Sequence, residues 1–252
     1  LVVQNKNGGL YDKFRNRLML PVIDTRGDVV AFGSRVLDKS EPKYMNSSET
    51  PVYSKRRVLY GLNLAKKSKR PNIILCEGNL DIVTLHQAGF DNAVASMGTA
   101  LTVEQTRLLS RFTKELVLCY DNDNAGKIAT ERALQILNGS EFSVKVLQLP
   151  RRLVDGEYIK QDADDFIKFQ GPDAFERLLN GSENGVEFRM AQIAGKYDLK
   201  DDEARIAYCG EVSELLASLP GAVEREIYTG RAAEAAGITA EAMKLEVQRS
   251  FK

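Results

Sequence analysis

Between residues 72 and 149, short apolar runs alternate with helical stretches, and this alternation constrains the fold more than any other feature of the chain. The apolar runs have the character of strands and read NIILCEG, NAVASMG, ELVLCYD and SVKVLQLP. The stretches between them have helical spacing and read NLDIVTLHQAG, TVEQTRLLSRF and AGKIATERALQIL. Strands that alternate with helices form βαβ units and a parallel sheet. Because the runs are continuously apolar, we expect helices to cover both faces of this sheet.

The segments on either side of the alternation have different patterns. Residues 18–37 read as two strands joined by a turn at 26–28, which predicts a hairpin. Residues 38–60 are polar and predict a long connection, and residues 61–70 predict a short basic helix that ends before Pro71. The chain is therefore expected to have three parts: an incomplete amino-terminal part at 1–70, an α/β domain at 71–171 and a helical part at 172–252.

The helical part begins where the strand signals stop. From about residue 172 the pattern is wholly helical to the end of the chain, so a separate bundle is expected. The Gly- and Asn-rich stretch at 180–185 predicts a boundary that a protease could reach.

Acidic side chains follow the predicted strands at the points where those strands end. One pair comes after the first strand of the alternation, a second pair ends the third strand, and a group of three that includes Asp165 follows the fourth strand by about a dozen residues. Ligands of open parallel sheets bind beyond the carboxyl ends of the strands, so these side chains are expected to converge. The set is Glu77, Asp81, Asp121, Asp123, Asp162 and Asp164.

Such a group of carboxylates cannot be fully ionised without a counter-charge. A hard divalent cation supplies that charge, and the absence of His and Cys from the group favours Mg²⁺ or Mn²⁺ over zinc. Two or more ions would stabilise the attacking and leaving oxygens of a nucleotidyl transfer. The alternative is that the aspartates cap helices, and this alternative is strongest for Asp81.

Composition limits the class of protein. Lys+Arg and Asp+Glu both number 35, which argues against a nucleic-acid coat or a membrane-surface protein and leaves local charged patches open. The three cysteines form no CxxC pair, which argues against zinc and suits the cytoplasm. No apolar run is long enough to predict a membrane span. The chain starts without Met, so we expect a fragment of a longer protein.

The motifs in their order resemble the Toprim domain of bacterial primases, topoisomerases and some nucleases, and the flanks narrow the resemblance to bacterial DNA primases. They read YDKFRNRLMLPVIDTRGDVVAFGSRVL, PKYMNSSET, LYGL, EGNLD, SMGTALT, YDNDNAGKIA and DADDFI, and they cover roughly residues 8–170. Two positions depart from the family pattern. Asn79 stands where an aromatic residue is common, and Ala163 stands where proline is typical.

The resemblance implies the fold and the activity. The expected fold is a Toprim-type parallel sheet flanked by helices, preceded by a small hairpin-containing segment and followed by an all-helical bundle. The expected activity is that of a DNA-directed RNA polymerase core, a nucleotidyltransferase that makes short RNA primers during DNA replication. The zinc module and the amino-terminal part of the polymerase core would then lie outside this chain.

The resemblance also implies roles for individual residues. Glu77, Asp121 and Asp123 would be catalytic metal ligands, with Asp81, Asp162 and Asp164 supporting or completing the site. Arg35, Lys43 and Lys55 match basic positions that face the cleft, where they would bind template or nucleotide phosphates. The implied partners are single-stranded DNA, ribonucleoside triphosphates and, within the primosome, the replicative helicase through a domain absent here.

Two alternatives remain open at this point. A Toprim nuclease or topoisomerase would share the acidic motifs, although the YDKFR and PKYMNS segments argue against it. A degenerate scaffold that only binds nucleic acid or a partner would not need intact carboxylates. No Walker loop and no GxGxxG motif supports an ATPase or a dinucleotide enzyme.

Overall fold

The structure, a computed structural model, describes residues 1–154 and 156–251. Within these ranges no helix combines the length and the apolar character that crossing a membrane requires.

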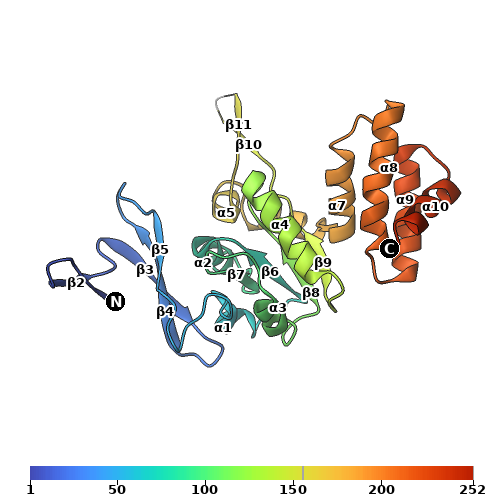
Figure 1. The fold of residues 1–252 in the computed structure, drawn as a ribbon. Helices are drawn as coiled ribbons and strands as arrows, with labels where there is room; N and C mark the ends of the chain where they lie inside the picture. The colour runs from blue at the N-terminus through green and yellow to red at the C-terminus, as the bar shows by residue number, and fades with distance from the viewer. Residues whose placement is uncertain (155, 252) are drawn as a thin grey trace.

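A five-stranded sheet with the order β12-β9-β8-β6-β7 forms the centre of the molecule (Figure 1). Four of its strands are parallel, as predicted, and the short β12 pairs antiparallel with β9 at one edge. The strands are β6 (Asn72–Cys76), β7 (Ala93–Ala95), β8 (Glu115–Leu118), β9 (Ser143–Val146) and β12 (Glu183–Asn184).

Helices cover both faces of this sheet. One face packs against a cluster that includes side chains of α3 (Val103–Leu109) and α4 (Asn124–Leu137). The opposite face packs against α2 (Asn79–Gln87), α5 (Ala163–Gln170) and α6 (Pro172–Asn180). The predicted fold class, a parallel sheet flanked by helices, is therefore confirmed.

Successive residues of β6 enter opposite cores, as the two-residue period of a strand requires. Ile73 and Leu75 lie in the core beneath α4, whereas Ile74 and Cys76 lie in the core beneath α2 and α5. All four side chains are almost completely buried. Burial on both faces explains why the strand reads as a continuous apolar run rather than as an alternation.

A separate antiparallel sheet precedes the central one. It consists of β3 (Arg17–Ile23), β4 (Val29–Val36) and β5 (Tyr44–Asn46), and the hairpin predicted at 26–28 joins β3 to β4. Because β5 pairs with β4, part of the expected connection is a strand. The following helix, α1 (Leu62–Ala65), is a single turn and is shorter than predicted. A two-stranded hairpin of β1 (Val2–Gln4) and β2 (Leu10–Asp12) starts the chain.

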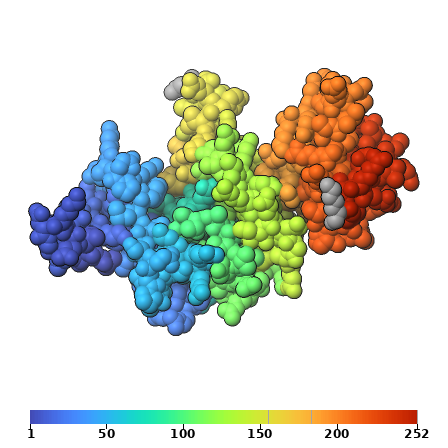
Figure 2. All heavy atoms as spheres, viewed as in Figure 1, coloured from blue at the N-terminus to red at the C-terminus, as the bar shows by residue number. Residues whose placement is uncertain are grey.

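A second hairpin interrupts the passage from β9 to α5. Its strands are β10 (Arg152–Val154) and β11 (Glu157–Ile159), and within the described residues they pair with each other and with no other strand. Figures 1 and 2 show this ribbon projecting from the body of the molecule above α5. The sequence pattern did not predict it.

Four helices follow the sheet and share a hydrophobic cluster of their own. Tyr208, Val212 and Met243 are among its buried members. Phe188 of the first helix is an exception, because it is buried in the core of the central sheet. Figure 2 shows these helices as a lobe beside the α/β part. They are α7 (Gly185–Ala194), α8 (Asp202–Ala217), α9 (Ala222–Ala236) and α10 (Ala240–Arg249).

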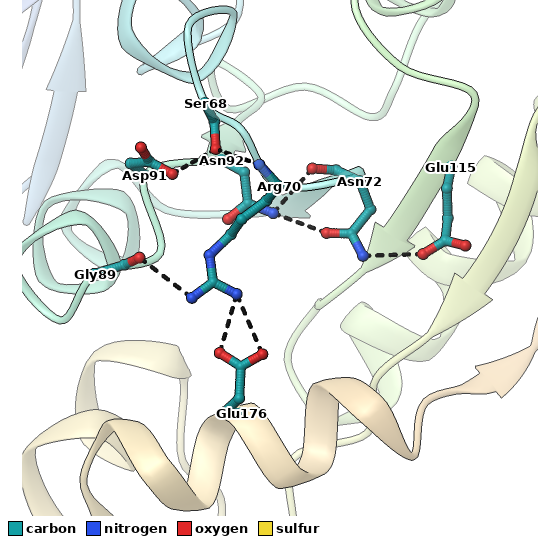
Figure 3. Close-up of polar contacts among 8 residues, drawn as sticks. All are labelled: Ser68, Arg70, Asn72, Gly89, Asp91, Asn92, Glu115 and Glu176. Atoms are coloured by element: carbon teal, nitrogen blue, oxygen red, sulfur yellow. Dashed lines mark hydrogen bonds and ion pairs between the residues drawn. The ribbon is translucent and has the colours of Figure 1, made fainter.

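A polar network ties the strands together at their amino-terminal ends (Figure 3). The Asn72 amide donates to Glu115 at 2.9 Å, which joins the starts of β6 and β8. The Arg70 guanidinium donates to both carboxylate oxygens of Glu176 on α6, at 3.0 and 3.2 Å. This network fixes the edge of the sheet that lies opposite the predicted acidic group.

Candidate active site

A cleft of about 420 Å³ opens at the edge where the parallel strands end. Segments that follow β6 and β8, together with the start of α5, line one side, and β4 and β5 line the other. Its charged lining residues are Arg35, Lys43, Glu77, Asp81, Asp121, Asp162, Asp164 and Asp165. The cleft therefore brings together the predicted acidic residues except Asp123, and two of the three predicted basic residues.

Glu77 and Asp121 lie at the ends of two adjacent parallel strands. The Asp121 backbone N–H donates to Oε1 of Glu77 at 3.3 Å. Burial and then the charge of Asp121 raise the pKa of Glu77. Burial likewise raises the pKa of Asp121, although Lys160 opposes this effect. The raised pKa values of both carboxyl groups indicate that nearby positive charge does not fully balance their negative charge.

Asp81 is buried at the start of α2 and links that helix to α5. Its carboxylate accepts the backbone N–H of Gly78 at 3.1 Å and that of Asp164 at 3.1 Å. Burial, followed by the charge of Asp162, raises the pKa of Asp81 to about 7. Asp81 thus has the capping contact that the sequence alternative proposed, and it also faces the cleft.

Asp123 caps helix α4 at the margin of the cleft. Its side chain accepts the Gly126 N–H at 2.9 Å and the Lys160 ammonium at 2.8 Å, and these bonds lower its pKa. Gly126 must be small here, because a Cβ at that position would lie 1.9 Å from the Asp121 carbonyl oxygen. This close approach explains the glycine of the DNDNAG motif.

Three aspartates gather at the start of α5. One carboxylate oxygen from each of Asp162, Asp164 and Asp165 lies within 4.8 Å of the others. Asp162 caps the helix through the N–H of Asp165 at 2.8 Å. Asp164 accepts a hydrogen bond from Thr84 and an ion pair from Lys168 at 2.5 Å. Capping and cation binding are compatible here, because each carboxylate has further lone pairs.

The basic side of the cleft comes from the antiparallel sheet. Arg35 and Lys43 both lie over the ring of Tyr44, with the guanidinium carbon at 6.0 Å and the ammonium at 5.6 Å from its centroid. Lys55 does not line the cleft. Its backbone N–H donates to Glu49 and its carbonyl accepts from Gln105, so it lies on the loop that packs against α3.

Sequence reasoning missed several residues of this site. Tyr44 and Asn46 line the cleft and belong to the quoted PKYMNSSET motif, so a signal for them was present. Asp165 was included in the acidic cluster of the sequence but was not proposed as a ligand, and it lines the cleft. Lys160 had no signal, because only the hairpin that the sequence did not predict carries it to Asp121 and Asp123.

Three family models match successive parts of the chain. Residues 1–66 match "DNA primase catalytic core, N-terminal domain", residues 74–167 match "Toprim-like", and residues 186–241 match "DnaB-helicase binding domain of primase". The last match corrects the expectation that the helicase-binding domain is absent from this chain. It covers nearly all of α7, all of α8 and α9, and only the first two residues of α10.

Relatives of known sequence and structure agree with these matches. A DNA primase of Clostridium acetobutylicum is 41% identical over 244 residues, which cover 96% of this chain and 39% of that protein. A DNA primase domain from Pseudomonas aeruginosa has a TM-score of 0.79 and 34% identity, and the match covers 98% of this chain and 77% of that one. The Escherichia coli primase catalytic core has a TM-score of 0.79 and 34% identity, with 94% and 75% covered. The chain spans about two fifths of the length of the curated relatives it matches.

Proposed function

Because this chain belongs to the bacterial DNA primase family, we propose that it is part of the catalytic core that joins ribonucleotides into short RNA primers on single-stranded DNA. The observation that carries the proposal is that strand-end carboxylates line the same cleft as Arg35 and Lys43. A related primase catalytic domain, 34% identical, has been solved bound to single-stranded DNA. The reaction class is nucleotidyl transfer from ribonucleoside triphosphates.

The acidic residues fit a divalent cation. Burial, and after it the charges of neighbouring carboxylates, raise the pKa values of Glu77, Asp81 and Asp121, which is expected where a bound cation normally compensates the charge. All donor atoms are carboxylate oxygens, the ligands that Mg²⁺ and Mn²⁺ prefer. Two or more such ions would stabilise charge on the attacking and leaving oxygens of the transfer. We propose Glu77, Asp121 and Asp123 as catalytic ligands, completed by Asp81, Asp162 and Asp164.

The opposite side of the cleft would hold the phosphates. Arg35 and Lys43 add positive charge to the lining of the cleft that holds the carboxylates, and both lie over the ring of Tyr44. A triphosphate or a template phosphate between the two sides would be attracted to these residues and held near the acidic edge. Lys55, which we also expected here, would act at most on nucleic acid that passes outside the cleft.

The helicase is the partner proposed for the helical lobe. Residues 186–241 match a helicase-binding model. In this region Ile206, Val223 and Ile227 expose large apolar side chains, as a docking surface requires. Replacing Val223 and Ile227 by Ser should weaken binding to the replicative helicase in a titration, while the carboxylate variants should not.

The alternative of a Toprim nuclease or topoisomerase has less support. It accounts for the match at 74–167, whereas primase models match on both sides of that segment. A binding-only scaffold is the remaining alternative, and an activity assay separates it from the proposal.

The test is extension of a short RNA primer annealed to a single-stranded DNA template, with labelled ribonucleotides and Mn²⁺ or Mg²⁺. A supplied primer removes the need for steps that other parts of a primase perform. The wild-type chain should extend the primer, and Asp121→Asn should abolish extension. Absence of extension by the wild type would refute the proposed activity of this chain, and cleavage of the template would favour the nuclease.

A further inference from the structure

Lys160 occupies the space between two of the proposed metal ligands. It follows the last residue of β11, and its ammonium lies 2.8 Å from Oδ2 of Asp123 and 3.5 Å from Oδ2 of Asp121. In the described part of the chain, the ion pairs of both aspartates are made with this lysine. Lys160 is therefore their resident counter-charge in the absence of an ion.

An ammonium and a divalent cation cannot both use these oxygens. A Mg²⁺ or Mn²⁺ ion binds carboxylate oxygen at roughly 2.0–2.2 Å and brings its own water shell into the space around it. Two cations a few ångströms apart also repel each other strongly in a partly buried site. We propose that Lys160 is a built-in competitor of the metal, which pairs with Asp121 and Asp123 when the site is free of ions and leaves them when a divalent cation binds.

The surroundings of Lys160 permit this exchange. Its side chain is 57% exposed, so it can move into solvent without disturbing a core. Within the described residues the preceding strand pairs with β10 alone, and Tyr158, two residues before the lysine, is 70% exposed. The ribbon that precedes the lysine projects away from the body of the molecule (Figure 1), and none of the described residues of β10 and β11 belongs to a hydrophobic core.

The displaced ammonium would pair with another anion in place of the carboxylates. Ribonucleoside triphosphates and nucleic-acid backbones are polyanions, and the lysine remains tethered at the cleft margin where such a ligand would enter. Exchange of a carboxylate partner for a phosphate partner would link ion binding to substrate binding.

This inference rests on the proposed metal site, and calorimetric titration with Mn²⁺ tests the two separately. Lys160→Gln keeps the length and polarity of the side chain but removes the charge, so it should bind Mn²⁺ about three- to tenfold more tightly than the wild type. Lys160→Arg restores the charge and should return the affinity to near the wild-type value. Lys145→Gln is the matched control, because Lys145 pairs with Glu115 at 3.2 Å at the opposite edge of the sheet.

The outcomes are distinct. Tighter binding by Lys160→Gln alone supports the inference. Equal or weaker binding by Lys160→Gln overturns it and leaves the metal site standing, whereas no binding by any variant overturns both.

A crystal structure of the wild type with Mn²⁺ tests the inference without any substitution, so a folding defect in a variant cannot affect the result. Anomalous scattering locates the ion, and the inference requires the Lys160 ammonium to lie beyond ion-pair distance of both aspartates. An ion bound at Glu77 and Asp121 with the lysine still on Asp121 and Asp123 would overturn it.

Discussion

Asp81 accepts a hydrogen bond at 3.1 Å from the backbone N–H of Asp164, a residue 83 positions further along the chain. The contact joins the start of α2 to the start of α5 across the cleft floor. Because the accepting carboxylate is buried, its charge state affects the stability of the junction between the two helices.

Stability without metal should fall as the pH rises through the acidic range. The pKa of Asp81 is about 7 in the folded chain and near 3.8 when unfolded, so between these values the folded state binds the extra proton. The unfolding free energy should drop by on the order of 2 kcal/mol between pH 5 and pH 7.5 on this account. Urea unfolding in EDTA at several pH values measures it. Asp81→Asn should flatten the decline, and equal slopes in the two proteins would contradict the assignment.

Asp121→Asn should weaken Mn²⁺ binding without unfolding the chain. The substitution removes a carboxylate ligand, and it relieves repulsion at Glu77, whose pKa Asp121 raises. We expect a loss of affinity of about tenfold or more by calorimetry, an estimate from the effect of removing one charge-assisted contact. The control is Asp28→Asn, because Asp28 has a 66% exposed side chain in the β3–β4 turn. Equal Mn²⁺ affinity in Asp121→Asn and the wild type would show that Asp121 is not a metal ligand.

Lys43→Ala should lower the affinity for single-stranded DNA and its dependence on salt. Lys43 lines the cleft, whereas Lys55 does not. The slope of log K against log salt should fall by roughly 0.7 for each lost phosphate contact. Fluorescence anisotropy at several salt concentrations gives both quantities, with Lys55→Ala as the comparison. If only Lys55→Ala changed the slope, nucleic acid would follow the outer loop rather than the cleft.

Phe188→Ala should loosen the attachment of the helical lobe. Phe188 is 3% exposed and is the side chain of α7 that enters the core of the central sheet. Removing a buried phenylalanine typically costs about 3–5 kcal/mol. Denaturant unfolding should then separate into two transitions, and proteases should gain access to the proposed boundary at 180–185. Phe112→Ala, at a position that is 39% exposed, should leave a single transition.

The central sheet was predictable because its signals are local. The run Asn72–Cys76 has no polar interruption after its first residue, and the stretch that follows closes on Gly89, which has a φ of 92° that favours glycine. Such signals do not depend on distant parts of the chain. The ends of β6 and β8 therefore gave the positions of Glu77 and Asp121 directly.

The rest depended on contacts between distant segments. β5 has three residues, and its pairing with β4 cannot be read from a polar stretch. The hairpin of β10 and β11 lacks a continuous apolar face, and none of its described residues belongs to a hydrophobic core. The sequence therefore has no hydrophobic pattern that predicts it. Lys160 was missed for the same reason. The sequence also offered no means to place Lys43 inside the cleft and Lys55 outside it.

The contact between Asp81 and Asp164 has a consequence during synthesis of the chain. A ribosome releases α2 well before it releases α5, so a nascent chain that ends before residue 164 has Glu77 and Asp121 but lacks the amide that holds Asp81. The contact that holds Asp81 is therefore completed only after the four parallel strands of the sheet have been made, and before the edge strand β12. A polypeptide that ends before residue 164 would lack part of the proposed cation site, and we expect it to be inert toward nucleotides even when its four parallel strands have paired.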